Sequence, residues 1–166
     1  MVGCLNEPRD AIVVGTLALL TDPAQRAIVD ADPQKWLHMF EETVRWVSPV
    51  GMYPRQTASR TELSGMPIEE GARAGVIVAS GNRDERMFDN PDVCNIARPR
   101  KPNLAFGSGA HYCMGVWAAR LLVGEIALPQ LFKSFRGLAL VGEIPIKWTG
   151  WVFRGPVNLP VHWNAA

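Results

Sequence analysis

The chain has 166 residues, and its hydrophobic content of 48% and charged content of 20% are ordinary for one soluble globular domain. A formal net charge of +1 excludes a strong overall attraction to nucleic acids or to anionic membranes. The three cysteines form no CxxC pair and no even set, so neither a disulfide scaffold nor a zinc site is expected, and a reducing, cytoplasmic compartment is favoured.

Apolar stretches in the chain are too short to cross a bilayer. The longest, residues 11–20, has ten residues and includes Gly15. The charged residues Glu7, Arg9 and Asp10 interrupt the first ten positions, a pattern unlike a secretory signal. The sequence therefore predicts no membrane segment and no secretory signal in this chain.

The first third of the chain predicts three helices. Residues 8–20 have a wide apolar face and begin with a proline, which is acceptable at a helix start. Asp22 and Asp32 each place a capping side chain before a proline at the first helical position, which predicts two further helix starts. The third helix carries four apolar residues spaced for one buried face: Leu37, Phe40, Val44 and Val47.

The middle of the chain predicts short strands and loops. Residues 53–60 read as an extended strand and residues 62–68 as a hairpin around Ser64-Gly65. A turn at residues 69–71 then leads to a short helical stretch that ends near residues 82–84. Residues 87–103 are rich in Pro, Asn and Asp with little periodicity, which predicts a meandering loop.

The last third of the chain predicts one long helix, which is followed by an aromatic-rich segment. The helix follows Cys113 and runs at least to Leu128, and Pro129 predicts a kink or break before the element ends near residues 133–136. Residues 147–162 carry three of the large aromatic residues, which are expected mostly to pack. Together the elements predict a mostly helical α+β fold.

The most informative stretch is Phe106-Gly-Ser-Gly-Ala-His-Tyr-Cys-Met-Gly115. The thiolate of Cys113 is a good ligand for iron, and backbone N–H groups in such a loop can point at the sulfur. His111 could reach an acidic edge of the same ligand, and Phe106 would cover the sulfur from water. This pattern predicts a Cys-ligated haem; the alternative is a buried structural cysteine in a glycine-rich turn. Three glycines would let the backbone approach a flat ligand closely: Gly107, Gly109 and Gly115.

The complete string Phe-Gly-x-Gly-x-His-x-Cys-x-Gly is similar to the haem-binding loop of the haem-thiolate monooxygenases, the cytochrome P450 family. The resemblance implies that Cys113 is the axial ligand of haem b, whose thiolate favours O–O cleavage. Family members are more than twice as long, and only their C-terminal portion matches. Residues 147–162 are similar to the family's terminal hairpin, which the resemblance implies here too. Residues 1–166 are therefore expected to form a single partial domain, with the pocket walls and substrate lid before Met1.

The resemblance also assigns the proton relay. Residues 8–20 are similar to the second half of the family's long central helix, which lies over the distal haem face and usually carries an acid followed by a threonine. This chain has Asn6 and Glu7 there, so these two are the expected catalytic residues. Buried carboxylates suit general-acid work. The alternative is that Glu7 only favours the dipole of its helix.

Two further groups of residues are assigned by the resemblance. Glu42 and Arg45 have a spacing that commonly gives a modest surface pair, but it is also similar to the family's Glu-x-x-Arg hallmark. Arg98 stands where the third member of that buried, structural network is expected. Arg55 stands where the family has a haem-propionate arginine, since a guanidinium binds carboxylates bidentately. The alternative for Arg55 is a solvated strand residue.

The implied function is a monooxygenase, an oxidoreductase that inserts one oxygen atom from O₂ into a small organic substrate. Electrons would come from a separate donor of the ferredoxin or flavodoxin type, and the fragment alone is not expected to be competent. Two alternatives stay open: a non-catalytic haem-binding module, and a degenerate remnant that binds nothing. Four basic residues would suit an acidic donor, unless they are ordinary solvated charges: Arg98, Arg100, Lys101 and Arg120.

Overall fold

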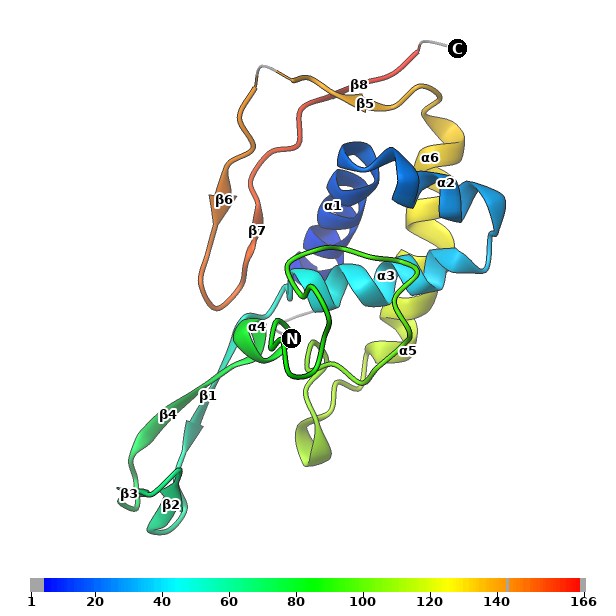
Figure 1. Ribbon diagram of the computed structural model, residues 1–166. Helices are drawn as coiled ribbons and strands as arrows, with labels where there is room; N and C mark the ends of the chain where they lie inside the picture. The colour runs from blue at the N-terminus through cyan, green and yellow to red at the C-terminus, as the bar shows by residue number, and fades with distance from the viewer. Residues whose placement is uncertain (1–4, 143, 165–166) are drawn as a thin grey trace.

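The computed structural model describes residues 5–142 and 144–164 (Figure 1). Its first three helices are α1 (Asn6–Thr21), α2 (Pro23–Ala31) and α3 (Lys35–Trp46). They pack with a long helical segment near the C-terminus into one body, and a strand arm projects from this body (Figure 1). The predicted α+β fold is confirmed.

The helix starts show where capping signals operate. The prediction at Asp22 is confirmed, because its side chain accepts hydrogen bonds from the backbone N–H groups of Ala24 (3.0 Å) and Gln25 (3.3 Å). The prediction at Asp32 is wrong by two residues, because the helix was expected to begin at Pro33. That carboxylate accepts from the N–H of Gln34 at 2.9 Å in a separate turn, and α3 begins only at Lys35.

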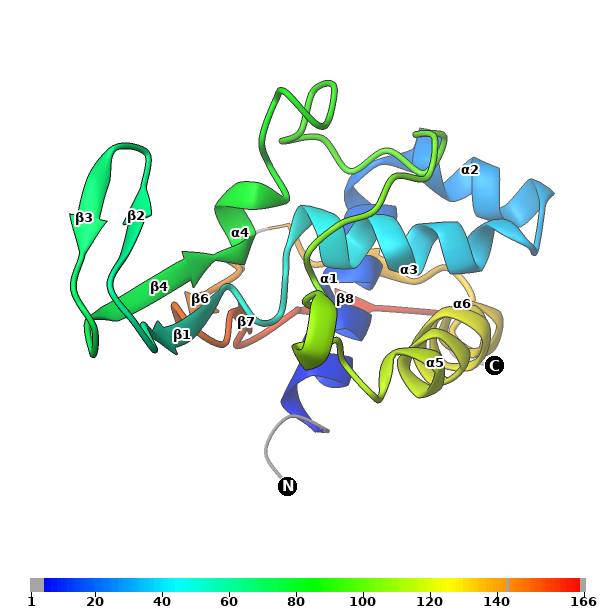
Figure 2. The same ribbon diagram turned by 90° about the horizontal axis from the view of Figure 1, so that it is seen from below.

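Two antiparallel strand pairs form the projecting arm. Strand β1 (Met52–Gln56) pairs with β4 (Arg73–Ile77), and β2 (Thr61–Leu63) pairs with β3 (Met66–Ile68) (Figure 2). The hairpin predicted around Ser64-Gly65 is confirmed, and both residues have positive φ, 52° and 79°.

The structure corrects two predictions in this arm. The strand predicted over residues 53–60 ends at Gln56, and β4 was missed, because only a short helical stretch was expected after residue 71. That helix, α4 (Val78–Gly81), follows β4 directly. All five residues of β4 are exposed, so the strand carries no alternating apolar pattern, and its pairing with β1 is non-local. All of residues 87–103 are described and none lies in a helix or strand, as predicted.

The long helical path after Cys113 has three parts: α5 (Val116–Ala119), a π-helical segment (Arg120–Ala127) and α6 (Leu128–Ser134). The chain keeps right-handed helical geometry up to Pro129, with φ −61° and ψ −51° at Leu128. Proline lacks an N–H donor, and a change in hydrogen-bond register commonly accommodates such a loss. The disruption expected at Pro129 is therefore a π-helical segment before it, and the helix does not end there.

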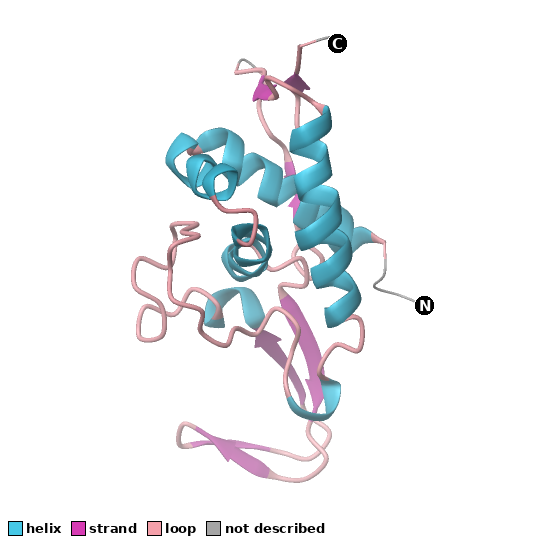
Figure 3. Cartoon of the chain, turned by 90° about the vertical axis from the view of Figure 1, so that its right-hand side faces the viewer, coloured by secondary structure: helices cyan, strands magenta, loops and turns pink. Residues whose placement is uncertain are grey.

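The C-terminal chain forms the predicted hairpin, which lies beside α1. Strand β5 (Ala139–Leu140) pairs with β8 (Val161–His162), and β6 (Trp148–Thr149) pairs with β7 (Gly155–Pro156). Figure 3 distinguishes the strands from the helices by colour. The hairpin tip is joined to the chain before β1: the N–H of Gly51 donates to Val152 at 2.7 Å, and that of Arg154 to Pro49 at 2.9 Å.

The core lies where α1, α3 and the long C-terminal helical path meet. Met39 and Leu128 are fully buried, and Phe40 and Val123 are 1% exposed. Gly15 allows this close approach, because a Cβ there would lie 3.1 Å from a methyl carbon of Leu128. Among the described residues no single helix has the length and hydropathy to cross a membrane; α1 and α2, bent by 107°, pass that test only as a pair.

Candidate functional site

The loop before Cys113 is closed by its own backbone. The N–H of Cys113 donates to the carbonyl of Phe106 at 2.9 Å, and a 3₁₀ turn (Gly109–His111) lies between them. Gly107 and Gly109 have φ of +72° and +62°, left-handed values that strain other residues. The thiol of Cys113 is unpaired and exposed at the outer side of this loop.

Helical geometry begins three residues after the thiol, at Val116, which is 2% exposed and anchors the segment in the core. Helix N-termini favour negative charge nearby. The next side chains are largely uncovered: Met114 is 98% and Trp117 is 74% exposed. Met114, Trp117 and the exposed Leu121 are spaced so that they lie on one side of the helical path. An apolar face therefore continues from the thiol along the helix.

Cys94 provides a contrast. It is buried, and burial, followed by the charge of Glu42, raises the pKa of its thiol to about 12. A thiol in such surroundings stays protonated and is a poor ligand. Of the two described cysteines, Cys113 is exposed and Cys94 is buried; Cys4 lies outside the described residues.

Tyr53 connects the Cys113 loop to β1 and to the start of α1. Its hydroxyl donates to the carbonyl of Ala105 at 3.3 Å. Burial raises its pKa, the negative charges of Cys113 and Glu7 add to that shift, and Arg55 opposes it. Tyr53 was not among the site residues predicted from the sequence. One signal was available, because residues two apart on a strand share a face and Tyr53 precedes Arg55 by two.

The structure places Arg55, His111 and the α1 start as follows. Arg55 is exposed, with its guanidinium carbon 5.6 Å from the Tyr53 ring centroid, and it donates to the carbonyl of Pro54 at 2.8 Å. His111 is exposed in the 3₁₀ turn. Asn6 is exposed, whereas Glu7 is half-buried.

Glu7 carries the unsatisfied polar atom of this region. Its Oε2 is buried and has no hydrogen-bond partner among the described residues. Leaving such an atom unpaired is costly, so this oxygen fits a site that binds a further group or water. The donor set as a whole fits haem: an exposed thiol, glycines that admit a flat ligand, and Arg55 and His111 available for carboxylates.

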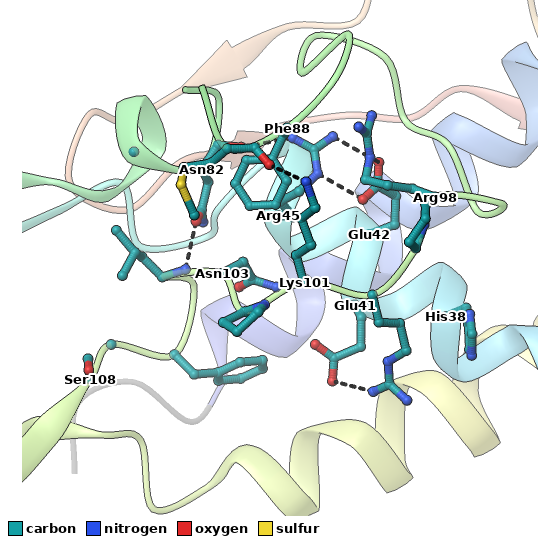
Figure 4. A pocket seen from close by; sticks show the side chains of 18 of the residues that line it. His38, Glu41, Glu42, Arg45, Asn82, Phe88, Arg98, Lys101, Asn103 and Ser108 are labelled. Carbon is teal, nitrogen blue, oxygen red and sulfur yellow. Dashed lines mark hydrogen bonds and ion pairs between the residues drawn. The ribbon is translucent and has the colours of Figure 1, made fainter. Parts of the chain in front are cut away.

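Glu42, Arg45 and Arg98 form one ion cluster (Figure 4). Arg45 is 2% exposed and binds the Glu42 carboxylate with two nitrogens, each at 2.8 Å, while Arg98 reaches the same carboxylate at 3.1 Å. Nitrogens of Arg45 and Arg98 also donate to backbone carbonyls in and before the loop 87–103, which fixes this loop to α3. These carbonyls belong to Asn82, Asp89, Asn90, Pro91 and Val93.

A cavity of about 660 Å³ lies between α3, the loop 87–103 and the Cys113 loop (Figure 4). Cys113, His111 and Arg55 do not line it, but residues of the Cys113 loop do, Phe106, Gly107 and Gly109 among them, so the cavity adjoins the thiol site. Its charges are partly neutralised: Glu41 lies 2.5 Å from Arg120 and 3.7 Å from Arg100. All four basic residues expected to face an electron donor line it: Arg98, Arg100, Lys101 and Arg120.

Comparison with known proteins gives one consistent result. The family model described as Cytochrome P450 matches residues 38–147. Cytochrome p450 CYP199A2 of Rhodopseudomonas palustris is 34% identical over 98% of this chain and 39% of its own length. Nocardicin C N-oxygenase of Nocardia uniformis is 36% identical over 98% of this chain and 42% of its own length.

A solved structure extends this result to the fold. The cytochrome P450 PksS of Bacillus subtilis superimposes with a TM-score of 0.87 and 32% identity, over 96% of this chain and 42% of that chain. The chain thus spans about two fifths of the length of these relatives. The resemblance predicted from the Cys113 loop is confirmed, and the chain belongs to the cytochrome P450 family.

Proposed function

We propose that this chain is the haem-binding portion of a P450-type monooxygenase, with Cys113 as the axial ligand of haem b. The observation that carries the proposal is the exposed Cys113 thiol at the end of a glycine loop closed onto Phe106. Bound haem would supply the activation of O₂ for insertion of one oxygen atom into an organic substrate.

The residues of the loop have distinct roles in this proposal. Gly107, Gly109 and Gly115 let the backbone approach a flat ligand, and Phe106 holds the backbone of Cys113. His111 and Arg55 would bind the carboxylate edge, because both are exposed and either can carry positive charge.

Glu7 would hold the proton in this proposal, with Asn6 beside it. Its unpaired, buried Oε2 supports this role, because such an oxygen can accept a hydrogen bond from water or from a bound group. The alternative is that Glu7 has no catalytic role. In the first turn of α1 its carboxylate would then only interact favourably with the helix dipole.

The electron donor in this proposal is a separate protein of the ferredoxin or flavodoxin type. The exposed Arg100 and Lys101 on the cavity wall support an acidic donor, whereas Arg98 and Arg120 are largely buried in ion pairs with Glu42 and Glu41. The relatives' names, an N-oxygenase among them, support oxygen insertion into a small organic substrate. A cytoplasmic location is part of the proposal and is supported by the unpaired cysteines.

For the chain on its own, one observation favours a second function, a non-catalytic haem-binding module. Cys113, Met114 and Trp117 are exposed, so a ligand held there would be open to water. Open sites do not control proton access. Turnover with O₂ and reductant separates the two functions, since only the monooxygenase gives an oxygenated product.

The ligand assignment is tested by reconstituting the chain with haem and reducing it under carbon monoxide. Wild type should show the red-shifted Soret band of thiolate ligation, and Cys113→Ser should lose it. Cys94→Ala is the matched control and should keep the band, because that thiol is buried. A band that survives in Cys113→Ser would overturn the assignment.

A further inference from the structure

Glu41 and Glu42 are neighbours on α3 but face different parts of the protein. Successive helix residues point about 100° apart. The Glu42 carboxylate meets Arg45 and Arg98, which hold the loop 87–103. The Glu41 carboxylate lies lower on the cavity wall, away from that cluster (Figure 4). Its partners are Arg120 and, more distantly, Arg100.

The Glu41–Arg120 pair is short and largely shielded from water. Arg120 Nε donates to Glu41 Oε1 at 2.5 Å, and the two side chains are 19% and 14% exposed. Burial disfavours the charge on Arg120, but the hydrogen bond and charge of Glu41, with a contribution from Tyr112, outweigh it and raise the pKa of Arg120 above its ordinary value. Arg120 therefore keeps its positive charge beside Glu41.

Arg120 contacts both sides of the Cys113 loop. Its guanidinium carbon lies 4.8 Å from the ring centroid of Trp117, on the helix that follows the cysteine, and 6.0 Å from that of Phe106, before the cysteine. Phe106 in turn accepts the backbone hydrogen bond of Cys113 at 2.9 Å. A single guanidinium thus connects Glu41 on α3 to the two segments between which Cys113 stands.

We propose that Glu41 and Arg120 are positioning residues for Cys113. The proposal rests on the proposed function, since it gives the pair the task of holding the haem-ligating thiol in place. Glu41 fixes Arg120, and Arg120 holds Phe106 and Trp117, so the loop 106–115 keeps its position relative to α3. The Glu42 cluster has a separate task, which is to hold the loop 87–103.

Hydrogen exchange of the whole chain, without haem, tests this division. In Glu41→Gln, amides of residues 106–115, that of Cys113 above all, should exchange about tenfold faster, since a hydrogen bond to a charged group contributes an effect of that order. Residues 87–98, which the Glu42 cluster holds, should be unchanged; Arg100 is left out of this comparison because it also pairs with Glu41 at 3.7 Å. Glu42→Gln should give the reverse pattern. Asp30→Asn, which breaks an exposed ion pair with Arg26, is the control and should alter neither segment.

Two results would overturn the proposal. One is an unchanged exchange rate in residues 106–115 of Glu41→Gln. The other is an equal increase of the exchange rate in both segments, because Glu41 would then stabilise the whole chain and not the Cys113 loop in particular. Should Glu41→Gln not fold, Glu41→Asp is measured by the same criteria. Arg120→Gln should reproduce the Glu41→Gln pattern, and the double variant should be no worse than either single variant.

A spectroscopic measurement separates this proposal from the proposed function. In haem-loaded Glu41→Gln, part of the thiolate-type ferrous carbonyl band should be replaced by the shorter-wavelength band that marks loss of the thiolate. Complete retention of the thiolate band would overturn the positioning role. Absence of that band in the wild type would instead overturn the proposed function, while hydrogen exchange still decides the positioning role.

Discussion

Arg45 and Glu42 lie one turn apart on α3 and are joined by two hydrogen bonds of 2.8 Å, with side chains only 2% and 8% exposed. Charges this deeply buried must have all their bonds satisfied. Here they do, because Arg98 and the N–H of Asn95 reach the same carboxylate. The cluster thereby connects α3 to a loop that has no helix or strand of its own.

Breaking this cluster should unfold or loosen the chain. Glu42→Gln and Arg45→Ala should each cost about 3–5 kcal/mol, because each leaves an uncompensated buried charge. Urea denaturation measures the loss, and haem retention should fall with it. The double variant should be less destabilised than the sum of the singles. Glu69→Gln breaks an exposed pair and is the control; additive losses at the buried site would contradict the network.

The two described cysteines should differ sharply in reactivity. Cys113 is exposed, so a maleimide should label it in the native chain, and bound haem should protect it. Cys94 should stay unlabelled at neutral pH, because burial raises the pKa of its thiol to about 12 and the protonated thiol is unreactive. Peptide mass spectrometry before and after denaturation distinguishes the sites. Native labelling of Cys94 would show that its surroundings are open.

The hairpin should depend on the absence of a side chain at Gly155. A Cβ there would lie 2.3 Å from Cγ of Asp10, a buried carboxyl on α1, so Gly155→Ala must push β7 away. Such overpacking costs about 1–3 kcal/mol, which should appear as a lower melting temperature. Gly142→Ala is the control, since nothing lies within 4 Å of its Cβ position. Equal effects of the two variants would rule out this packing role.

The isolated 166 residues should bind haem weakly and associate. Met114 and Trp117 are exposed on the face that continues from the thiol, and large apolar patches promote association. Reduction in air should yield peroxide and little product, because an open site admits water. Sedimentation velocity and a peroxide assay test this. Adding the N-terminal part of a relative in trans should restore order; a monomer with coupled turnover would refute the prediction.

Trp117→Gln separates the apolar face from general misfolding. The substitution removes one exposed ring and should reduce association without lowering the melting temperature, because Trp117 is 74% exposed. Trp36→Gln is the matched control: that ring is buried in the core, 5.7 Å from Phe132, and its loss should destabilise the chain. Unchanged association in Trp117→Gln would place the contact elsewhere.

Local signals in the sequence determined most of the helices and the Cys113 loop. Asp22 caps α2, Ser64-Gly65 makes the hairpin turn, and the spacing of glycines around Cys113 identifies the family. Each of these depends on residues within about ten positions of one another, so the chemistry can be recognised without knowing the fold. The positions of Glu42, Arg45 and Arg98 were assigned by family resemblance, and the structure brings those side chains together.

Only the tertiary structure decided the features that depend on partners far apart in the chain. Strand β4 exists because β1 pairs with it, Tyr53 matters because Cys113 and Glu7 lie near it, and Arg120 meets Glu41 across the cavity. None of these residues has a local pattern that names its partner. Burial and pairing are set by packing, and packing is fixed only when the whole chain has folded.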